Sequence, residues 1–242
     1  MILIIKTGHT VSSLRAQWED FEDWIVEGSG FPREDFMVLS VFKDEPLPLP
    51  QDVAGAIITG SPSNVTEQLP WMVLTTDWLR NAIAQHLPIL GICFGHQLLA
   101  HALGGEVAFH PGGREIGTVE VLLTEEGKQD ALLGAVPPRF NAQVSHLQTV
   151  VSLPPQAVIL ASNAFDPHHA VRYAERAWGL QFHPEFSRRI MLAYIDERRP
   201  ALEKEGFVYE DLNGAVQETP VATALLQRFV SQAGRDTYKL IS

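Results

Sequence analysis

The chain has 242 residues, of which 45% are hydrophobic and 19% are charged, a composition typical of globular proteins that bury a sizeable core. Its net charge of −11 disfavours nucleic-acid binding, since phosphate contacts need clustered Lys and Arg, and no apolar run approaches the roughly 18–20 residues of a membrane span. The single cysteine excludes an intramolecular disulfide, and the N-terminus lacks the basic and long apolar regions of a signal peptide, so we expect a cytoplasmic protein with a reduced thiol.

The first hundred residues predict alternating strands and helices. Residues 2–5 form a short apolar run typical of a buried parallel strand. The next segment has apolar residues at helical spacing, at Leu14, Trp18, Phe21 and Ile25. The predicted order is strand 2–5, helix 14–26, strand 35–42, strand 54–59, helix 69–85, strand 88–92 and helix 94–103. This order implies a parallel sheet with helices on both faces.

The rest of the chain predicts short strands joined by turns, followed by two helices. The expected strands are 106–109, 117–123, 140–145, 149–152, 158–162, 169–173 and 177–181. Helix 187–204 begins at a serine cap and helix 219–232 has a proline at its first turn, with 205–218 as a loop between them. We therefore expect one domain over residues 1–242. Its fold class is α/β, a three-layer, flavodoxin-like α/β/α arrangement with a mainly parallel sheet and a small antiparallel patch.

One stretch carries the strongest chemical signal. The apolar run 88–92 passes directly into helix 94–103, and the only cysteine, Cys93, lies at the junction in the pattern Gly91-Ile-Cys93-Phe-Gly95. Hydrolases with a G-x-S-x-G motif present their nucleophile on such a strand-to-helix elbow. The glycines remove Cβ atoms that would collide in the turn, and the helix N-terminus favours a thiolate over a thiol. We predict that Cys93 is a nucleophile.

A cysteine nucleophile needs a base and a group that orients the base. His183 and Glu185 are the best candidates, because residues two apart in an extended segment point the same way and the proline between them has a fixed φ. Attack on a carbonyl also needs donors for the oxyanion. The N–H of Phe94 at the helix start and the N–H of Gly60, after another predicted strand, are the expected donors.

Five motifs together resemble the class I (triad-type) glutamine amidotransferases, and are most similar to stand-alone relatives of the glutaminase domain of GMP synthase. They occur in the order found in that family: Gly60-Ser-Pro62, Gly91-Ile-Cys-Phe-Gly-His-Gln97, Gly113-Arg-Glu-Ile-Gly117, Ser145-His146 and Gln181-Phe-His-Pro-Glu185. The cysteine motif combined with the His-Pro-Glu motif is specific to the family.

The resemblance implies a reaction. Cys93 attacks the side-chain amide of glutamine, Gly60 and Phe94 hold the oxyanion, and His183, oriented by Glu185, protonates the leaving ammonia. Water then cleaves the γ-glutamyl thioester. The resemblance implies no cofactor and no metal. Because no synthetase domain follows, any ammonia acceptor is expected to be a separate synthetase subunit.

The resemblance also implies substrate-binding residues, namely Gln97, Ser145, His146 and Gln148. Relatives of the GMP synthase type carry an acidic residue, which helps to bind the substrate α-amino group, where this chain has Gln148. A neutral amide offers hydrogen bonds but no charge pairing.

Two alternatives remain open from the sequence. The first is a γ-glutamyl peptidase or hydrolase acting on γ-glutamylated small molecules, which would use the same triad and would fit the neutral Gln148. The second is a non-catalytic regulatory binding module that keeps the fold, although its expected signature is a broken triad. In each reading the ligand is glutamine or a γ-glutamyl small molecule, with no nucleic acid and no membrane as partner.

Overall fold

We analysed a computed structural model of the chain, which describes residues 1–239 and the side chains of residues 1–234. The strands are β1 (Ile2–Lys6), β2 (Phe36–Ser40), β3 (Gly55–Ile58), β4 (Ile89–Ile92), β5 (Glu106–Phe109), β6 (Glu115–Leu123), β7 (Arg139–His146), β8 (Gln148–Ser152), β9 (Val158–Ser162), β10 (Ala170–Ala174) and β11 (Ala177–Leu180). The helices are α1 (Ser12–Trp18), α2 (Phe21–Ser29), α3 (Pro70–Ala84), α4 (Phe94–Ala102), α5 (Glu125–Gln129), α6 (Arg188–Lys204), α7 (Tyr209–Ala215) and α8 (Pro220–Lys239).

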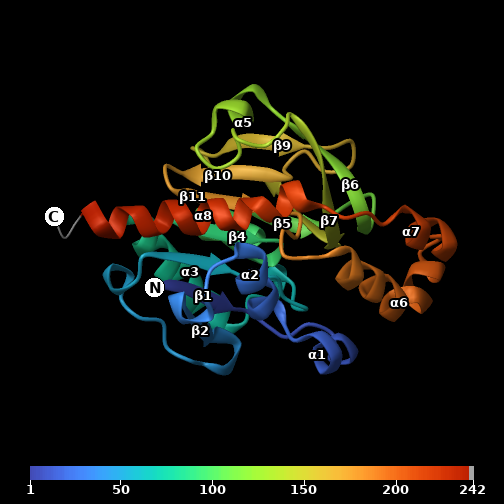
Figure 1. The fold of residues 1–242 in the computed structure, drawn as a ribbon, viewed down its shortest axis with the longest axis horizontal. Coiled ribbons are helices and arrows are strands. Elements are labelled where there is room, and N and C mark those ends of the chain that lie inside the picture. Colours follow the sequence, from blue (N-terminus) through green and yellow to red (C-terminus); the bar gives the residue numbers. More distant parts are fainter. Residues whose placement is uncertain (240–242) are drawn as a thin grey trace.

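The central sheet has nine strands in the order β2-β1-β3-β4-β11-β10-β9-β6-β7. Its first five strands pair in parallel, and the remaining pairs are antiparallel. Strands β5 and β8 form the separate antiparallel patch that the sequence predicts. The expected fold class is confirmed, with β4 and β11 side by side at the centre of the sheet (Figure 1).

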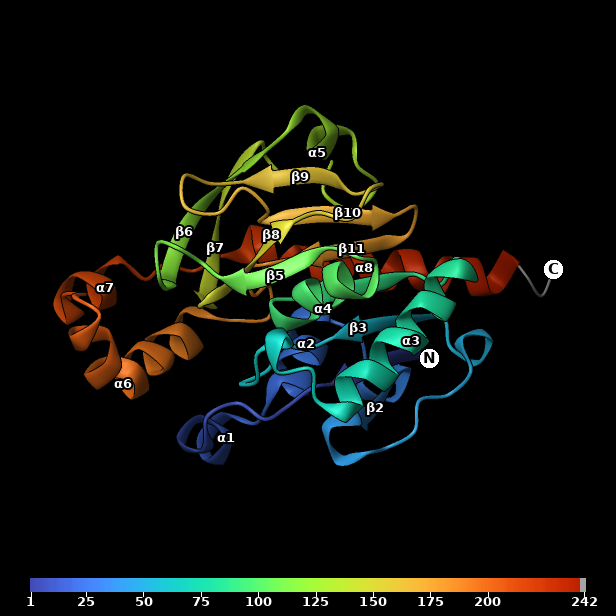
Figure 2. The same cartoon turned by 180° about the vertical axis from the view of Figure 1, so that it is seen from behind.

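Helices cover both faces of this sheet because its central strands are apolar on both sides. Ile57 of β3 packs on one face, in the core that contains Leu226 and Phe229 of α8. Its neighbour Ile58 packs on the other face, with Leu79 of α3, as the two-residue period of a strand requires. Figures 1 and 2 show α2 and α8 on one side and α3 and α4 on the other. In the described part of the chain, no helix is apolar over a length that could cross a membrane.

A third apolar cluster lies beyond the carboxyl ends of the parallel strands. There α1 and α6 pack together through Leu14, Ile190 and Tyr194, and Phe186 joins them to α2. Strand ends at this edge are the usual place for a ligand in an open α/β sheet. The cluster therefore positions α6 above the edge where we expect the site.

Several sequence-based boundaries are corrected. The predicted helix 14–26 is two helices, because Glu19 has φ of 68° and Asp20 starts α2 with a capping box that includes Asp23. The predicted loop 205–218 contains α7. In α3, Leu74 lies at helical spacing from Trp71 and Trp78, a pattern that predicts burial, but it is 69% exposed. The structure also adds the short helix α5 and extends the last helix to the end of α8.

Candidate active site

Cys93 lies at the elbow between β4 and α4. Its φ of 50° and ψ of −102° place it in a backbone conformation rare for a residue with a side chain, and its N–H donates to the carbonyl of Leu180 at 2.7 Å. Glycine is required on both sides of Cys93 because neighbouring backbone atoms leave no room for a Cβ. A Cβ on Gly91 would lie 2.4 Å from the carbonyl oxygen of Gly95, and a Cβ on Gly95 would lie 2.6 Å from that of Ile58.

His183 follows β11 and faces the elbow. Its Nδ1 lies 2.7 Å from Oε1 of Glu185, and both side chains are buried. The backbone N–H of His183 donates to the carbonyl of Gln143 at 2.8 Å, and its ring stacks on Phe186 with 4.0 Å between centroids. The structure thus brings together the three residues that the sequence predicts as a triad.

The charge state of His183 depends on its two neighbours. Burial lowers the pKa of this imidazole, whereas the carboxylate of Glu185 and the side chain of Cys93, which also shares a hydrogen bond with it, raise the pKa to about 10. The protonated ring is therefore the favoured form at neutral pH. An imidazolium next to a thiolate can donate a proton to a departing amine.

Gly60 lies against the same imidazole, since a Cβ on it would be 3.0 Å from Cε1 of His183. Its carbonyl accepts hydrogen bonds from the hydroxyls of Thr7 and Thr59, each at 2.8 Å, which fixes the orientation of the peptide. Within residues 1–239, the N–H groups of Gly60 and Phe94 have no hydrogen-bond acceptor. Both expected oxyanion donors are free to bind a ligand oxygen.

The pocket at Cys93 is small and covered. It has a volume of about 40 Å³, close to the space of one water molecule, whereas ligand sites commonly measure ~300 Å³ or more. The loop after β1 and helix α6 form its cover, joined by a 2.6 Å hydrogen bond between the hydroxyls of Thr10 and Tyr194. A 2.7 Å bond from Ser13 also links α1 to Glu197 of α6. A ligand the size of glutamine requires this cover to move.

Helix α6 contributes two pocket residues that the sequence analysis did not identify, Tyr194 and Arg198. Arg198 has its guanidinium 5.4 Å from the centre of the Tyr194 ring, and its Nε is buried without a hydrogen-bond acceptor. Burial lowers the pKa of Arg198. The spacing of four residues puts both side chains on one helix face, but no sequence signal shows that this face meets Cys93.

Of the four predicted substrate-binding residues, only Ser145 lines the pocket at Cys93. The amide of Gln97 is engaged internally, donating to the carbonyl of Gln148 at 2.7 Å and to Oε1 of Gln181 at 3.0 Å. The side chain of Gln148 is buried and donates to Thr66 at 2.7 Å, while its Oε1 has no partner. Neither amide lines the pocket at Cys93.

His146 belongs to a buried polar cluster that does not line the pocket at Cys93. Its Nε2 lies 3.0 Å from Glu115, which is also 3.1 Å from His169 and accepts a 2.6 Å hydrogen bond from Asn163. Burial would raise the pKa of Glu115, but its histidine and asparagine partners hold that pKa well below the usual range. The Nδ1 of His146 lies 3.0 Å from the carbonyl of Gln148, so the cluster holds the loop between β7 and β8.

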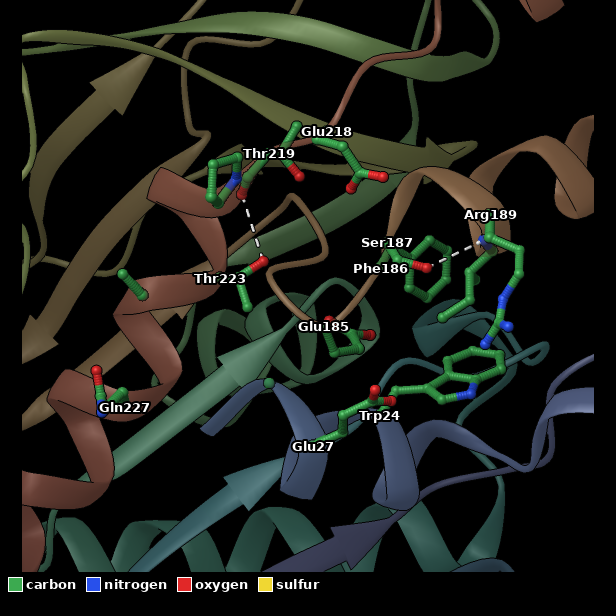
Figure 3. Close-up of a pocket in the computed structure, with 14 residues that line it drawn as sticks. Trp24, Glu27, Glu185, Phe186, Ser187, Arg189, Glu218, Thr219, Thr223 and Gln227 are labelled. Atoms are coloured by element: carbon green, nitrogen blue, oxygen red, sulfur yellow. Dashed lines mark hydrogen bonds between the residues drawn. The ribbon is translucent and has the colours of Figure 1, made fainter. Parts of the chain in front are cut away.

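A separate, open groove of about 820 Å³ lies on the other side of Glu185. Figure 3 shows Glu185 between α2, with Trp24 and Glu27, and α8, with Thr223 and Gln227. Neither Cys93 nor His183 lines this groove. It therefore reaches the candidate triad only from behind the carboxylate, whose Oε2 is buried without a partner.

Comparison with solved structures shows a shared fold. A glutamine amidotransferase from Thermotoga maritima superposes with a TM-score of 0.75 at 25% sequence identity, covering 96% of this chain and 97% of that one.

Three curated relatives cover only part of the chain. The GMP synthase of Aeropyrum pernix is 36% identical over 132 residues, which are 54% of this chain and 24% of that protein. One subunit of the glutamine-hydrolysing GMP synthase of Methanococcus maripaludis is 32% identical over 56% of this chain and 66% of its own length. Gamma-glutamyl peptidase 4 of Arabidopsis thaliana is 27% identical over 74% of this chain and 66% of its own length. The chain thus spans about a quarter of the first relative's length.

The family model "Glutamine amidotransferase class-I" matches residues 37–195. This region contains the elbow and the His-Pro-Glu segment. Together with the fold, this match shows that the chain belongs to the class I glutamine amidotransferase family.

Proposed function

We propose that this protein cleaves the amide bond of a γ-glutamyl group through a thioester on Cys93. The observation that carries the proposal is the lone cysteine on a strained elbow, facing a buried imidazole whose other nitrogen lies 2.7 Å from a carboxylate. Strained backbone and a strongly shifted pKa in one pocket are typical of catalytic sites. A complete triad argues against a purely regulatory binding module.

In the proposed reaction, Sγ of Cys93 attacks the γ-carbonyl carbon and the oxyanion forms between the N–H groups of Gly60 and Phe94. His183 donates its proton to the nitrogen as the C–N bond breaks. Water, deprotonated by the now neutral His183, then attacks the thioester and releases glutamate and the thiolate. Glu185 keeps the ring in place throughout. Because this chemistry needs a free thiolate, we propose a cytoplasmic location.

The first candidate substrate is glutamine, with ammonia passed to a separate synthetase subunit. The relative in Methanococcus maripaludis supports this arrangement, since its name describes it as one subunit of a glutamine-hydrolysing GMP synthase.

The second candidate is a γ-glutamyl peptidase acting on γ-glutamylated small molecules. Two observations favour it. Gln148 is neutral and buried, and gamma-glutamyl peptidase 4 of Arabidopsis thaliana matches 74% of this chain, compared with 56% for the GMP synthase subunit of Methanococcus maripaludis.

A hydrolysis panel tests the proposal. Purified protein is assayed with glutamine, γ-glutamyl amino acids and γ-glutamyl peptides, alongside Cys93→Ala and the control His86→Ala, which changes an exposed histidine before β4. We expect cleavage of at least one compound, loss of cleavage in Cys93→Ala and full activity in the control. Undiminished cleavage by Cys93→Ala would refute the mechanism.

A further inference from the structure

Arg198 lines the Cys93 pocket, and its Nε is buried without a hydrogen-bond acceptor. No described side chain forms an ion pair with it, and the neighbouring carboxylates are already occupied. Glu197 accepts a hydrogen bond from Ser13, and Glu205 is bound through both oxygens by Arg114, at 2.8 and 3.0 Å. A half-buried arginine is usually paired, because desolvating its charge is costly. Arg198 is therefore available for an anion that enters the pocket.

The position of Arg198 indicates which half of a substrate it would meet. Its guanidinium lies over the ring of Tyr194, at 5.4 Å. Tyr194 packs on Phe186 with centroids 4.8 Å apart, and Phe186 stacks on His183 at 4.0 Å. Arg198, Tyr194 and His183 all line the Cys93 pocket, and Phe186 joins the rings of Tyr194 and His183 without lining it. This chain of contacts connects Arg198 to the side of the pocket where His183 lies.

The leaving group must depart on that same side, because His183 supplies its proton. Ammonia carries no negative charge, so a guanidinium placed there would bind nothing when glutamine is cleaved. An amino acid or peptide as leaving group ends in a carboxylate, which is the group that the planar fork of arginine binds best.

We propose that Arg198 is a specificity-determining residue that binds the carboxylate of an amino-acid or peptide leaving group, so that the preferred substrates are γ-glutamyl amino acids or peptides. This inference rests on the proposed function and chooses between its two candidates. It assigns to α6 a binding role that the sequence motifs do not contain.

The first test compares γ-glutamylglycine with γ-glutamylglycinamide, which differ only in the leaving-group carboxylate. We expect the wild type to prefer the carboxylate, and Arg198→Gln to reduce the ratio of the two kcat/KM values by about 10- to 100-fold. Arg198→Lys, which keeps the charge but loses the fork, should recover part of the ratio. Arg199→Gln is the matched control, because Arg199 is exposed and paired with Glu203, and its ratio should equal that of the wild type.

Two results would overturn the inference. One is a wild-type ratio near one. The other is an equal loss for both compounds in Arg198→Gln, which would place the guanidinium on the α-carboxylate of the glutamyl half.

Alkylation of Cys93 separates failure of this inference from failure of the proposed function. The chain has one cysteine, so the mass increase after treatment with iodoacetate or neutral iodoacetamide reports that site alone. Both reagents require the same opening of the cover, so the ratio of their rates isolates the charge effect. We expect Arg198→Gln to reduce the iodoacetate-to-iodoacetamide rate ratio by about fivefold, with Arg199→Gln unchanged. If no γ-glutamyl compound is cleaved, this drop still establishes the anion site, and an unchanged ratio refutes it.

Discussion

Adding one methyl group at Gly91 should damage both folding and catalysis. The Cβ of Gly91→Ala would lie 2.4 Å from the carbonyl oxygen of Gly95, 2.5 Å from its carbonyl carbon and 2.7 Å from the nitrogen of His96. These are backbone atoms in the first turn of α4, so no side chain can rotate to make room. Ordinary contact begins near 3.4 Å, and the turn would therefore have to shift by about 1 Å, the size of the largest overlap.

We expect the free energy of unfolding to fall by about 3 kcal/mol, the upper end of the range for an overpacked core. For a chain of this size that corresponds to a decrease in Tm of about 6–12 °C. A shift of the elbow by about 1 Å also moves the nucleophile, which can reduce the rate by ~100-fold.

Thermal unfolding followed by circular dichroism, together with the hydrolysis assay, measures both effects. Gly234→Ala in α8 is the matched control, because a Cβ there meets nothing within 4 Å and alanine favours a helix. We expect its Tm to equal or exceed that of the wild type. A Gly91→Ala protein with unchanged Tm and activity would refute the elbow geometry.

Two further predictions concern the triad and the cover. Glu185→Gln removes the carboxylate that, together with Cys93, raises the pKa of His183 to about 10, so the pKa of this buried ring should fall. The imidazolium is then lost at a lower pH, and the alkaline limb of kcat/KM should move down in pH with a rate loss of about 10²- to 10⁴-fold. An unchanged pH profile would show that the carboxylate does not control the ring. Tyr194→Phe removes the 2.6 Å hydrogen bond to Thr10, which contributes about 0.5–1.5 kcal/mol. Iodoacetamide should then label Cys93 about 2- to 12-fold faster than in the wild type. Equal labelling rates would show that this bond does not hold the cover closed.

The sequence predicted the sheet well because each central strand is a continuous apolar run that must be buried on both faces. It failed at helix 14–26, where apolar spacing continues across the break. The break arises from Glu19 in the left-handed region and from the Asp20–Asp23 capping box. That capping pattern is visible in the sequence, but the helical spacing of the apolar residues on both sides of it predicts one continuous helix.

The elbow and the His-Pro-Glu segment were predictable because each is local, with its geometry set by a few neighbouring residues. The residues that α6 contributes to the pocket could not be predicted. Tyr194 and Arg198 lie on a helix whose many charges favour a solvated face, and only tertiary packing brings that face over Cys93. Likewise Gln97 is drawn into internal hydrogen bonds with groups 51 and 84 residues away in the sequence.

The central claim is a covalent γ-glutamyl intermediate on Cys93, and partitioning with hydroxylamine tests it most directly. During cleavage of γ-glutamylglycine and of γ-glutamylglycinamide, hydroxylamine and water compete for the same thioester. We predict one ratio of γ-glutamyl hydroxamate to glutamate for both substrates, and no hydroxamate with Cys93→Ala. A ratio that depends on the leaving group, or hydroxamate formed by Cys93→Ala, would contradict the account.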